Sequence, residues 1–159
     1  IGKVEVFKHK YQFKERKCIL LCPYATVTVT AGTRNEIFKR LAKALLKKGY
    51  RVFTNAVDEQ SVIEGTEGIS CSLNELFEIG RYFEGVIGIR SGVMDLLAFE
   101  DVRMVALFPE KSEYEEFFDL RLTNPENTKI SQYRLTADIE YDMEKILNLM
   151  NLGGEKNEC

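Results

Sequence analysis

The sequence lacks the features that define several large classes of protein. No run of apolar residues approaches the ~20 that a membrane-spanning helix needs. The stretch before Cys18, IGKVEVFKHKYQFKERK, contains no apolar core of the kind found in a signal peptide. The four cysteines, Cys18, Cys22, Cys71 and Cys159, show neither the paired spacing of a zinc site nor the density of a disulfide scaffold. We therefore expect free thiols, a reducing compartment and a cytoplasmic protein.

Several catalytic motifs are also absent. No G-x-G-x-x-G follows the first apolar run, which disfavours a dinucleotide-dependent dehydrogenase, and no Walker loop is present. The single histidine, His9, precedes the apolar runs, which disfavours a Ser-His-Asp or Cys-His catalytic unit. Acidic pairs such as Glu115-Glu116 fit a solvated helix surface better than a catalytic site. We expect no metal and no cofactor, and any chemistry to rest on phosphate recognition.

The composition is that of a globular domain. The chain has 159 residues, of which 45% are hydrophobic and 30% charged, enough for one core without a disulfide or metal. We divide it into a leader (residues 1–17), one domain (18–152) and a flexible tail (153–159). The formal net charge of −3 argues against nucleic-acid binding. Because the chain begins at Ile1, we expect it to be part of a longer protein, with half of a site missing.

The leader is locally basic. Residues 1–17 contain six Lys or Arg and two Glu. Such a segment is typical of a solvated linker from an upstream domain. The alternative is a patch that contacts anionic lipid headgroups at the inner face of a membrane.

Apolar runs alternate with helical patterns from Cys18 onward. Near-continuous apolar strands between helices predict a Rossmann-like α/β fold, a doubly wound, mainly parallel sheet with helices on both faces. The predicted strands are residues 18–22, 50–54, 68–71, 85–89, 103–108 and 130–135. Capping-box spacing, a Ser or Thr followed three residues later by Glu, predicts helices that begin at Thr33, Ser72 and Ser112. We further expect helices over 91–99 and 138–150, and a short helical piece near 59–63.

The strand-to-helix loop at Arg90, Ser91 and Gly92 is the predicted working site. Ligands of open parallel sheets bind beyond the carboxyl ends of the strands. A guanidinium at Arg90 matches phosphate oxygens, and backbone N–H groups at the helix start attract anions. Gly92 would let a ligand approach the backbone. The alternative is that Ser91 only caps the helix and Arg90 is only a surface cation.

A second loop, residues 23–32, follows the first strand. Thr26, Thr28 and Thr30 alternate in it, which fits a continuing strand with hydroxyls on one face. Pro23 before them and Gly32 after them favour a loop instead, whose hydroxyls would face the same crevice as Arg90.

Three segments carry a family resemblance: Ser72-Leu73-Asn74-Glu75-Leu76, Val86 through Asp95, and Val105-Ala106-Leu107-Phe108-Pro109. Together they resemble the C-terminal, nucleotide-sugar-binding half of GT-B-fold glycosyltransferases, in the pattern of heptosyltransferase-like enzymes. The resemblance implies that Ser91 and Gly92 contact the diphosphate of the donor, with Thr26 and Thr28 in the facing phosphate loop. Two positions depart from the family: Arg90 stands where those enzymes have Asp, and Asp95 where they have His. Asp95 would then hold a ribose or sugar hydroxyl, or face solvent.

GT-B enzymes work in a cleft between two Rossmann-like halves, and the resemblance covers one half. It implies that this chain binds a nucleotide-diphosphate sugar, requires a missing N-terminal half-domain, and is inactive alone. The enzyme would transfer the sugar to a glycan or glycolipid acceptor, and no catalytic residue is identified. The alternative function is a non-enzymatic α/β module that binds a phosphorylated ligand or a protein partner.

Overall fold

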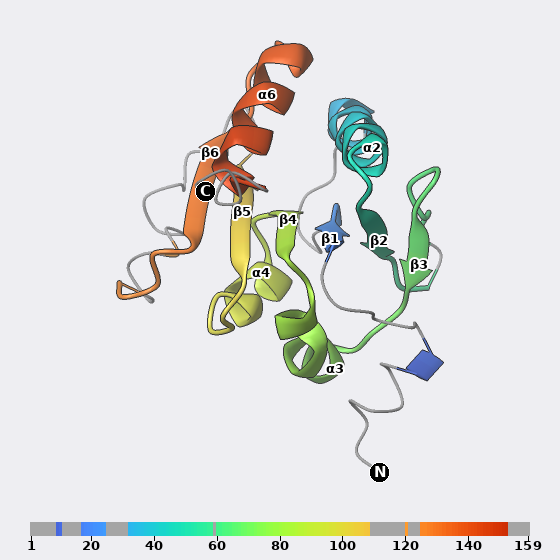
Figure 1. Ribbon diagram of the computed structural model, residues 1–159, viewed down its shortest axis with the longest axis vertical. Helices are drawn as coiled ribbons and strands as arrows, with labels where there is room; N and C mark the ends of the chain where they lie inside the picture. Colours follow the sequence, from blue (N-terminus) through green and yellow to red (C-terminus); the bar gives the residue numbers. More distant parts are fainter. Residues whose placement is uncertain are drawn as a thin grey trace, which may run out of the picture.

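The computed structural model describes residues 9–10, 17–24, 32–58, 60–108, 120 and 125–152. Six strands form one sheet, with helices packed against both of its faces (Figure 1). The strands are β1 (Cys18–Cys22), β2 (Arg51–Asn55), β3 (Glu67–Ile69), β4 (Gly85–Ile89), β5 (Arg103–Phe108) and β6 (Ile130–Arg134). The helices are α2 (Gly32–Lys47), α3 (Leu73–Ile79), the 3₁₀ turn η1 (Gly80–Tyr82), α4 (Gly92–Leu97) and α6 (Ile139–Met150).

The strand order is β3-β2-β1-β4-β5-β6, and every neighbouring pair is parallel. Strands β1, β2 and β3 are therefore added in sequence toward one edge of the sheet. Strand β4 lies on the other side of β1, and β5 and β6 follow it toward the opposite edge. This arrangement confirms the predicted Rossmann-like, doubly wound α/β fold. The order reverses between β1 and β4, where such sheets leave a crevice at their carboxyl edge.

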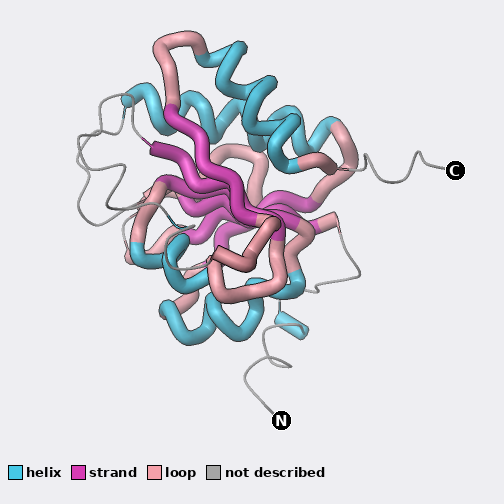
Figure 2. The backbone as a smooth tube through the Cα atoms, turned by 90° about the vertical axis from the view of Figure 1, so that its left-hand side faces the viewer, coloured by secondary structure: helices cyan, strands magenta, loops and turns pink. Residues whose placement is uncertain are grey.

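The helices form one layer on each side of the sheet. Helices α2 and α6 pack on one face and α3 and α4 on the other, as Figures 1 and 2 show from perpendicular directions. Strand β1 is buried throughout, and its side chains divide between the two layers. Ile19 and Leu21 join the core under α2 and α6, whereas Cys18, Leu20 and Cys22 join the core under α3 and α4. Strands apolar on both faces are what a sheet covered on both sides requires.

Local signals set most helix ends. At the start of α3, Ser72 and Glu75 form the predicted capping box: the Glu75 N–H donates to Ser72 Oγ at 3.2 Å, and the Ser72 N–H donates to Glu75 Oε1 at 2.9 Å. Helix α2 ends at Lys47, and Gly49 beyond it has a φ of 93°. With the chain turned in this way, the N–H groups of Gly49 and Tyr50 donate to the carbonyls of Leu46 and Leu45 in the last turn. Helix α2 begins at Gly32, one residue before the predicted start at Thr33.

A buried carboxylate joins β6 to α6. Asp142 is 2% exposed and accepts hydrogen bonds from the Tyr133 hydroxyl at 2.7 Å, the Thr136 N–H at 2.9 Å and the Thr136 hydroxyl at 2.8 Å. Asp138 caps the same helix by accepting from the Tyr141 N–H at 3.0 Å. The end of the last strand is therefore tied to the first turns of the last helix.

Some predicted boundaries are wrong. Residues 60–63 are not helical, because the Ile63 N–H donates to Thr54 Oγ1 at 3.3 Å instead of a helical carbonyl. Helix α4 ends at Leu97, two residues before the predicted end. Residues 111–119, with the predicted capping box at Ser112, and the tail 153–159 lie outside the described residues, as does most of the leader. Within the described part of the chain, no helix combines the length and apolar character needed to cross a membrane.

Candidate functional site

The candidate site lies where β1 and β4 end side by side. Cys22, the last residue of β1, is paired in register with Gly88, one residue before the end of β4. The two strands run parallel, so the segments that follow them leave the sheet at the same edge. The strand order also reverses here. The predicted loop at Arg90 therefore occupies the edge at which doubly wound folds bind ligands.

A single residue separates the end of the β4–β5 ladder from α4. The Arg90 N–H donates to the Leu107 carbonyl at 2.9 Å, which extends the ladder one residue beyond β4. Ser91 is extended, with φ −162° and ψ 176°, and α4 begins at Gly92. The Asp95 N–H then donates to the Ser91 carbonyl at 3.0 Å as the first helical hydrogen bond. This abrupt junction places Arg90, Ser91 and Asp95 together.

The junction depends on a glycine that sequence reasoning did not single out. A Cβ at Gly88 would lie 2.6 Å from Met94 Sδ and 2.8 Å from Cys22 Cβ. Gly88 therefore lets α4 and β1 approach the end of β4 closely. The signal in the sequence was a glycine inside an otherwise apolar strand, which often marks a close approach.

Arg90 is ion-paired and mostly buried. Its Nη2 lies 2.6 Å from Asp95 Oδ1, and its Nη1–H donates to the Ser91 carbonyl at 3.3 Å. The Arg90 side chain is 14% exposed, so most of it is shielded from solvent. The Asp95 side chain is 49% exposed and contacts Arg90 directly. The structure thus brings together two of the predicted site residues as an ion pair.

Ser91 and Gly92 are placed differently from a simple helix cap. Ser91 occupies the N-cap position, yet its side chain makes no capping hydrogen bond. Its Oγ is buried and has no hydrogen-bond partner in the described part of the structure. A Cβ at Gly92 would meet no atom within 4 Å, so the described residues leave the space beside Gly92 open. Helix α4 has only six residues, so its dipole is a small contribution to any anion site.

A polar residue missed by sequence reasoning ends the neighbouring strand. Asn55 is the last residue of β2, and its Oδ1 is buried without a hydrogen-bond partner among the described residues. Because Leu21 pairs with Thr54, Asn55 lies level with Cys22 at the carboxyl edge. The sequence pattern that could have indicated Asn55 is a polar residue at the end of a mainly apolar strand. The predicted Thr26 and Thr28 lie outside the described residues.

The cysteines near this edge are not nucleophiles. Burial raises the pKa of the Cys22 thiol to about 12, so the thiol is protonated at neutral pH. Burial, with a smaller effect of Glu75, raises the pKa of Cys71 to about 12 as well. Cys18, Cys22 and Cys71 are buried in the core as thiols, as predicted for these three. In the described ranges, no group of His, Cys, Asp and Glu is arranged to hold a metal ion.

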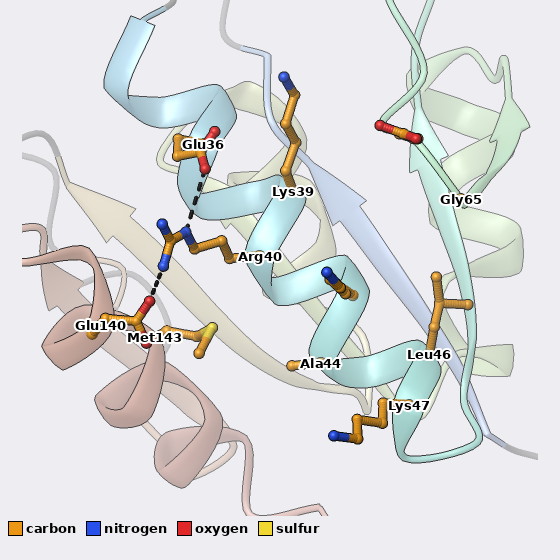
Figure 3. A pocket seen from close by; sticks show the side chains of 11 residues that line it. Glu36, Lys39, Arg40, Ala44, Leu46, Lys47, Gly65, Glu140 and Met143 are labelled. Atoms are coloured by element: carbon orange, nitrogen blue, oxygen red, sulfur yellow. Dashed lines mark hydrogen bonds and ion pairs between the residues drawn. The ribbon is translucent and has the colours of Figure 1, made fainter.

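A groove lies along α2, on the face of the sheet that α2 and α6 cover (Figure 3). It encloses about 740 Å³ between α2, the start of α6 and the turn at Glu64 and Gly65. Arg40 crosses it, paired with Glu36 at 3.3 Å and with Glu140 of α6. None of the predicted site residues lines this groove. The Arg40 ion pairs span this groove between α2 and α6. We do not assign the ligand site to it.

In comparisons with known proteins, no family model matches this chain and no curated protein matches it. The class supported by the fold is therefore a Rossmann-like α/β domain, and the glycosyltransferase resemblance stays a prediction.

Proposed function

We propose that this domain binds the diphosphate of a nucleotide sugar at the carboxyl edge between β1 and β4, as the donor-binding half of a glycosyltransferase. The observation that carries the proposal is the mostly buried Arg90 guanidinium at the reversal of strand order, beside the open space at Gly92. Guanidinium groups bind phosphate oxygens through paired N–H donors. The position and the chemistry both favour an anionic ligand.

Three residues would contribute to binding of the diphosphate. Arg90 supplies the positive charge, and the unpartnered Ser91 hydroxyl can donate to a phosphate oxygen. Gly92 keeps the neighbouring space free of a side chain. During transfer, the same guanidinium would stabilise the charge that develops on the leaving nucleoside diphosphate as the glycosidic bond breaks. The acceptor, a glycan or glycolipid, would bind on a second, N-terminal half-domain, so the domain alone would be inactive.

A second function, a non-enzymatic module that binds a phosphorylated ligand, is supported by one observation. The carboxylate at the edge, Asp95, is ion-paired with Arg90, and the thiol at the edge, Cys22, is protonated. Neither group is prepared to act as a general base or a nucleophile. Both functions share the phosphate site and differ in whether a partner half supplies the chemistry. Contact of residues 1–17 with anionic lipid stays a prediction.

The first experiment is a thermal-shift panel with GDP, UDP, ADP, TDP and CMP. We expect one diphosphate to raise the melting temperature selectively. Arg90→Ala should weaken its binding about ten- to a hundredfold, the range of a charge-assisted hydrogen bond.

The matched control is Arg103→Ala. Arg103 is also partly buried, but it begins β5 and lies at the opposite, amino edge of the sheet. Its loss should leave nucleotide binding unchanged. If a folded sample responds to none of the nucleotides, or if both variants weaken binding equally, the proposed site is wrong.

A further inference from the structure

The Arg90–Asp95 pair is asymmetric in its access to solvent. The Arg90 side chain is 14% exposed and the Asp95 side chain 49%. The carboxylate is therefore the member of the pair that an arriving ligand meets more readily. Asp95 Oδ1 lies 2.6 Å from Arg90 Nη2. It therefore occupies an N–H donor that could otherwise bind a phosphate oxygen.

This arrangement opposes anion binding in two ways. Asp95 neutralises the charge of Arg90, so the pair attracts an anion less strongly than an arginine without this carboxylate would. A phosphate that reached Arg90 would also lie close to the Asp95 carboxylate, and like charges at such a separation repel each other. A single phosphate group at Arg90 must lie beside Asp95, whereas a diphosphate has a second phosphate group, whose oxygens can make further contacts away from the carboxylate.

We propose that Asp95 is an internal competitor that occupies Arg90 until a diphosphate displaces it. This inference rests on the proposed function, because it concerns the same arginine. On binding, Arg90 exchanges the carboxylate for phosphate oxygens, and the half-exposed Asp95 turns toward solvent. Asp95 is then a specificity-determining residue that discriminates diphosphates from inorganic phosphate.

The chain offers a matched control for this idea. Asp101 is also ion-paired, with Lys129 at 2.5 Å, but this pair lies away from Arg90 and the Asp101 side chain is 85% exposed. Asp101→Asn removes the same negative charge as Asp95→Asn but leaves the partner of Arg90 in place. Comparison of the two variants separates local competition from a change in net charge.

The experiment is calorimetric titration of the chain with inorganic pyrophosphate and, separately, with inorganic phosphate. Asp95→Asn should bind pyrophosphate about tenfold more tightly than the unmodified chain and should bind phosphate more tightly by a larger factor. Asp101→Asn should stay within about twofold of the unmodified chain. In an Arg90→Ala background, Asp95→Asn should have a smaller effect, because the exchange partner is gone. Asp95→Ser is measured in parallel, to exclude an effect of the new asparagine side chain itself on phosphate binding. Thermal unfolding of each variant checks that it is folded.

Each outcome decides between the two proposals. Tighter binding by both Asp95 variants supports competition, including the case in which only these variants bind measurably. If the unmodified chain binds pyrophosphate and the Asp95 variants bind equally or more weakly, the competition is wrong and the proposed function stands. Weaker binding would identify Asp95 as a positioning residue for Arg90. If neither the unmodified chain nor the Asp95 variants bind pyrophosphate, both this inference and the proposed diphosphate site are wrong.

Discussion

The hydroxyl of Tyr133 donates a 2.7 Å hydrogen bond to the buried carboxylate of Asp142. Tyr133 lies on β6 and Asp142 on α6, so the bond fastens the last helix to the edge strand of the sheet. Burial and this hydrogen bond raise the pKa of Tyr133 above its ordinary value. The native state therefore holds the phenolic proton more tightly than the unfolded chain does.

Tyr133→Phe should lower the free energy of unfolding by about 1–1.5 kcal/mol, the net contribution of such a bond. The stabilisation is complete below about pH 10, the ordinary tyrosine pKa, and is lost as the pH rises through the higher native pKa. Urea unfolding at about pH 8 and about pH 11 should therefore show a difference between the unmodified chain and the variant that shrinks at the higher pH. Tyr141→Phe, at a half-exposed position of α6, is the control and should change little. A difference independent of pH would contradict the predicted titration.

Ser72→Ala should destabilise the chain by about 1 kcal/mol. The reason is that Ser72 Oγ accepts a hydrogen bond from the backbone N–H of Glu75 in the capping box of α3. Chemical denaturation of the variant measures this loss. Ser61→Ala is a suitable control, since it changes an exposed serine of the β2–β3 connection. Equal stability of the two variants would mean that α3 does not depend on its cap.

Gly88→Ala and Gly92→Ala should separate stability from binding. The new Cβ at Gly88 would meet Met94 Sδ at 2.6 Å and Cys22 Cβ at 2.8 Å, and this overpacking should cost about 1–3 kcal/mol of stability. A Cβ at Gly92 meets no described atom within 4 Å, so stability should change by less than about 0.5 kcal/mol. If the ligand approaches the backbone there, the Gly92 variant should still lose affinity for the diphosphate that the thermal-shift panel selects. Unchanged affinity would exclude Gly92 from the contact surface.

The buried cysteines should resist thiol reagents. Burial raises the pKa values of Cys22 and Cys71 to about 12, so both are protonated as well as shielded. In a Cys159→Ser background, labelling by a disulfide reagent at about pH 8 should be roughly a hundredfold slower in native conditions than in urea. Rapid labelling of the native chain would show that one of these thiols is accessible.

The sequence predicted the fold class and most elements because their signals are local. Five consecutive apolar residues in β1 and β4 are typical of strands buried on both faces, and both strands have the predicted bounds. The spacing of Ser72 and Glu75 predicted a cap that the structure confirms, since capping needs only one turn of chain. The position of the loop at Arg90 was also predictable, because a buried strand that leads directly into a helix is a local pattern.

The rest depended on contacts between different elements of the fold. The helix expected near residues 59–63 does not form over residues 60–63, because Thr54 at the end of β2 accepts the Ile63 N–H. Asp142 has the appearance in sequence of an exposed acid in the first turn of a helix, yet partners from β6 and the following turn allow it to be buried.

By itself, then, the sequence determined a parallel α/β domain with a strand-to-helix loop at Arg90, since strand patterns and helix caps depend on a few neighbouring residues. Only the tertiary structure decided the strand order, which brings Cys22 level with Gly88 and Asn55 to the same edge. It also decided that Arg90 is buried against Asp95 rather than exposed. The physical reason is that burial and charge pairing depend on which segments pack together, and no local pattern specifies that.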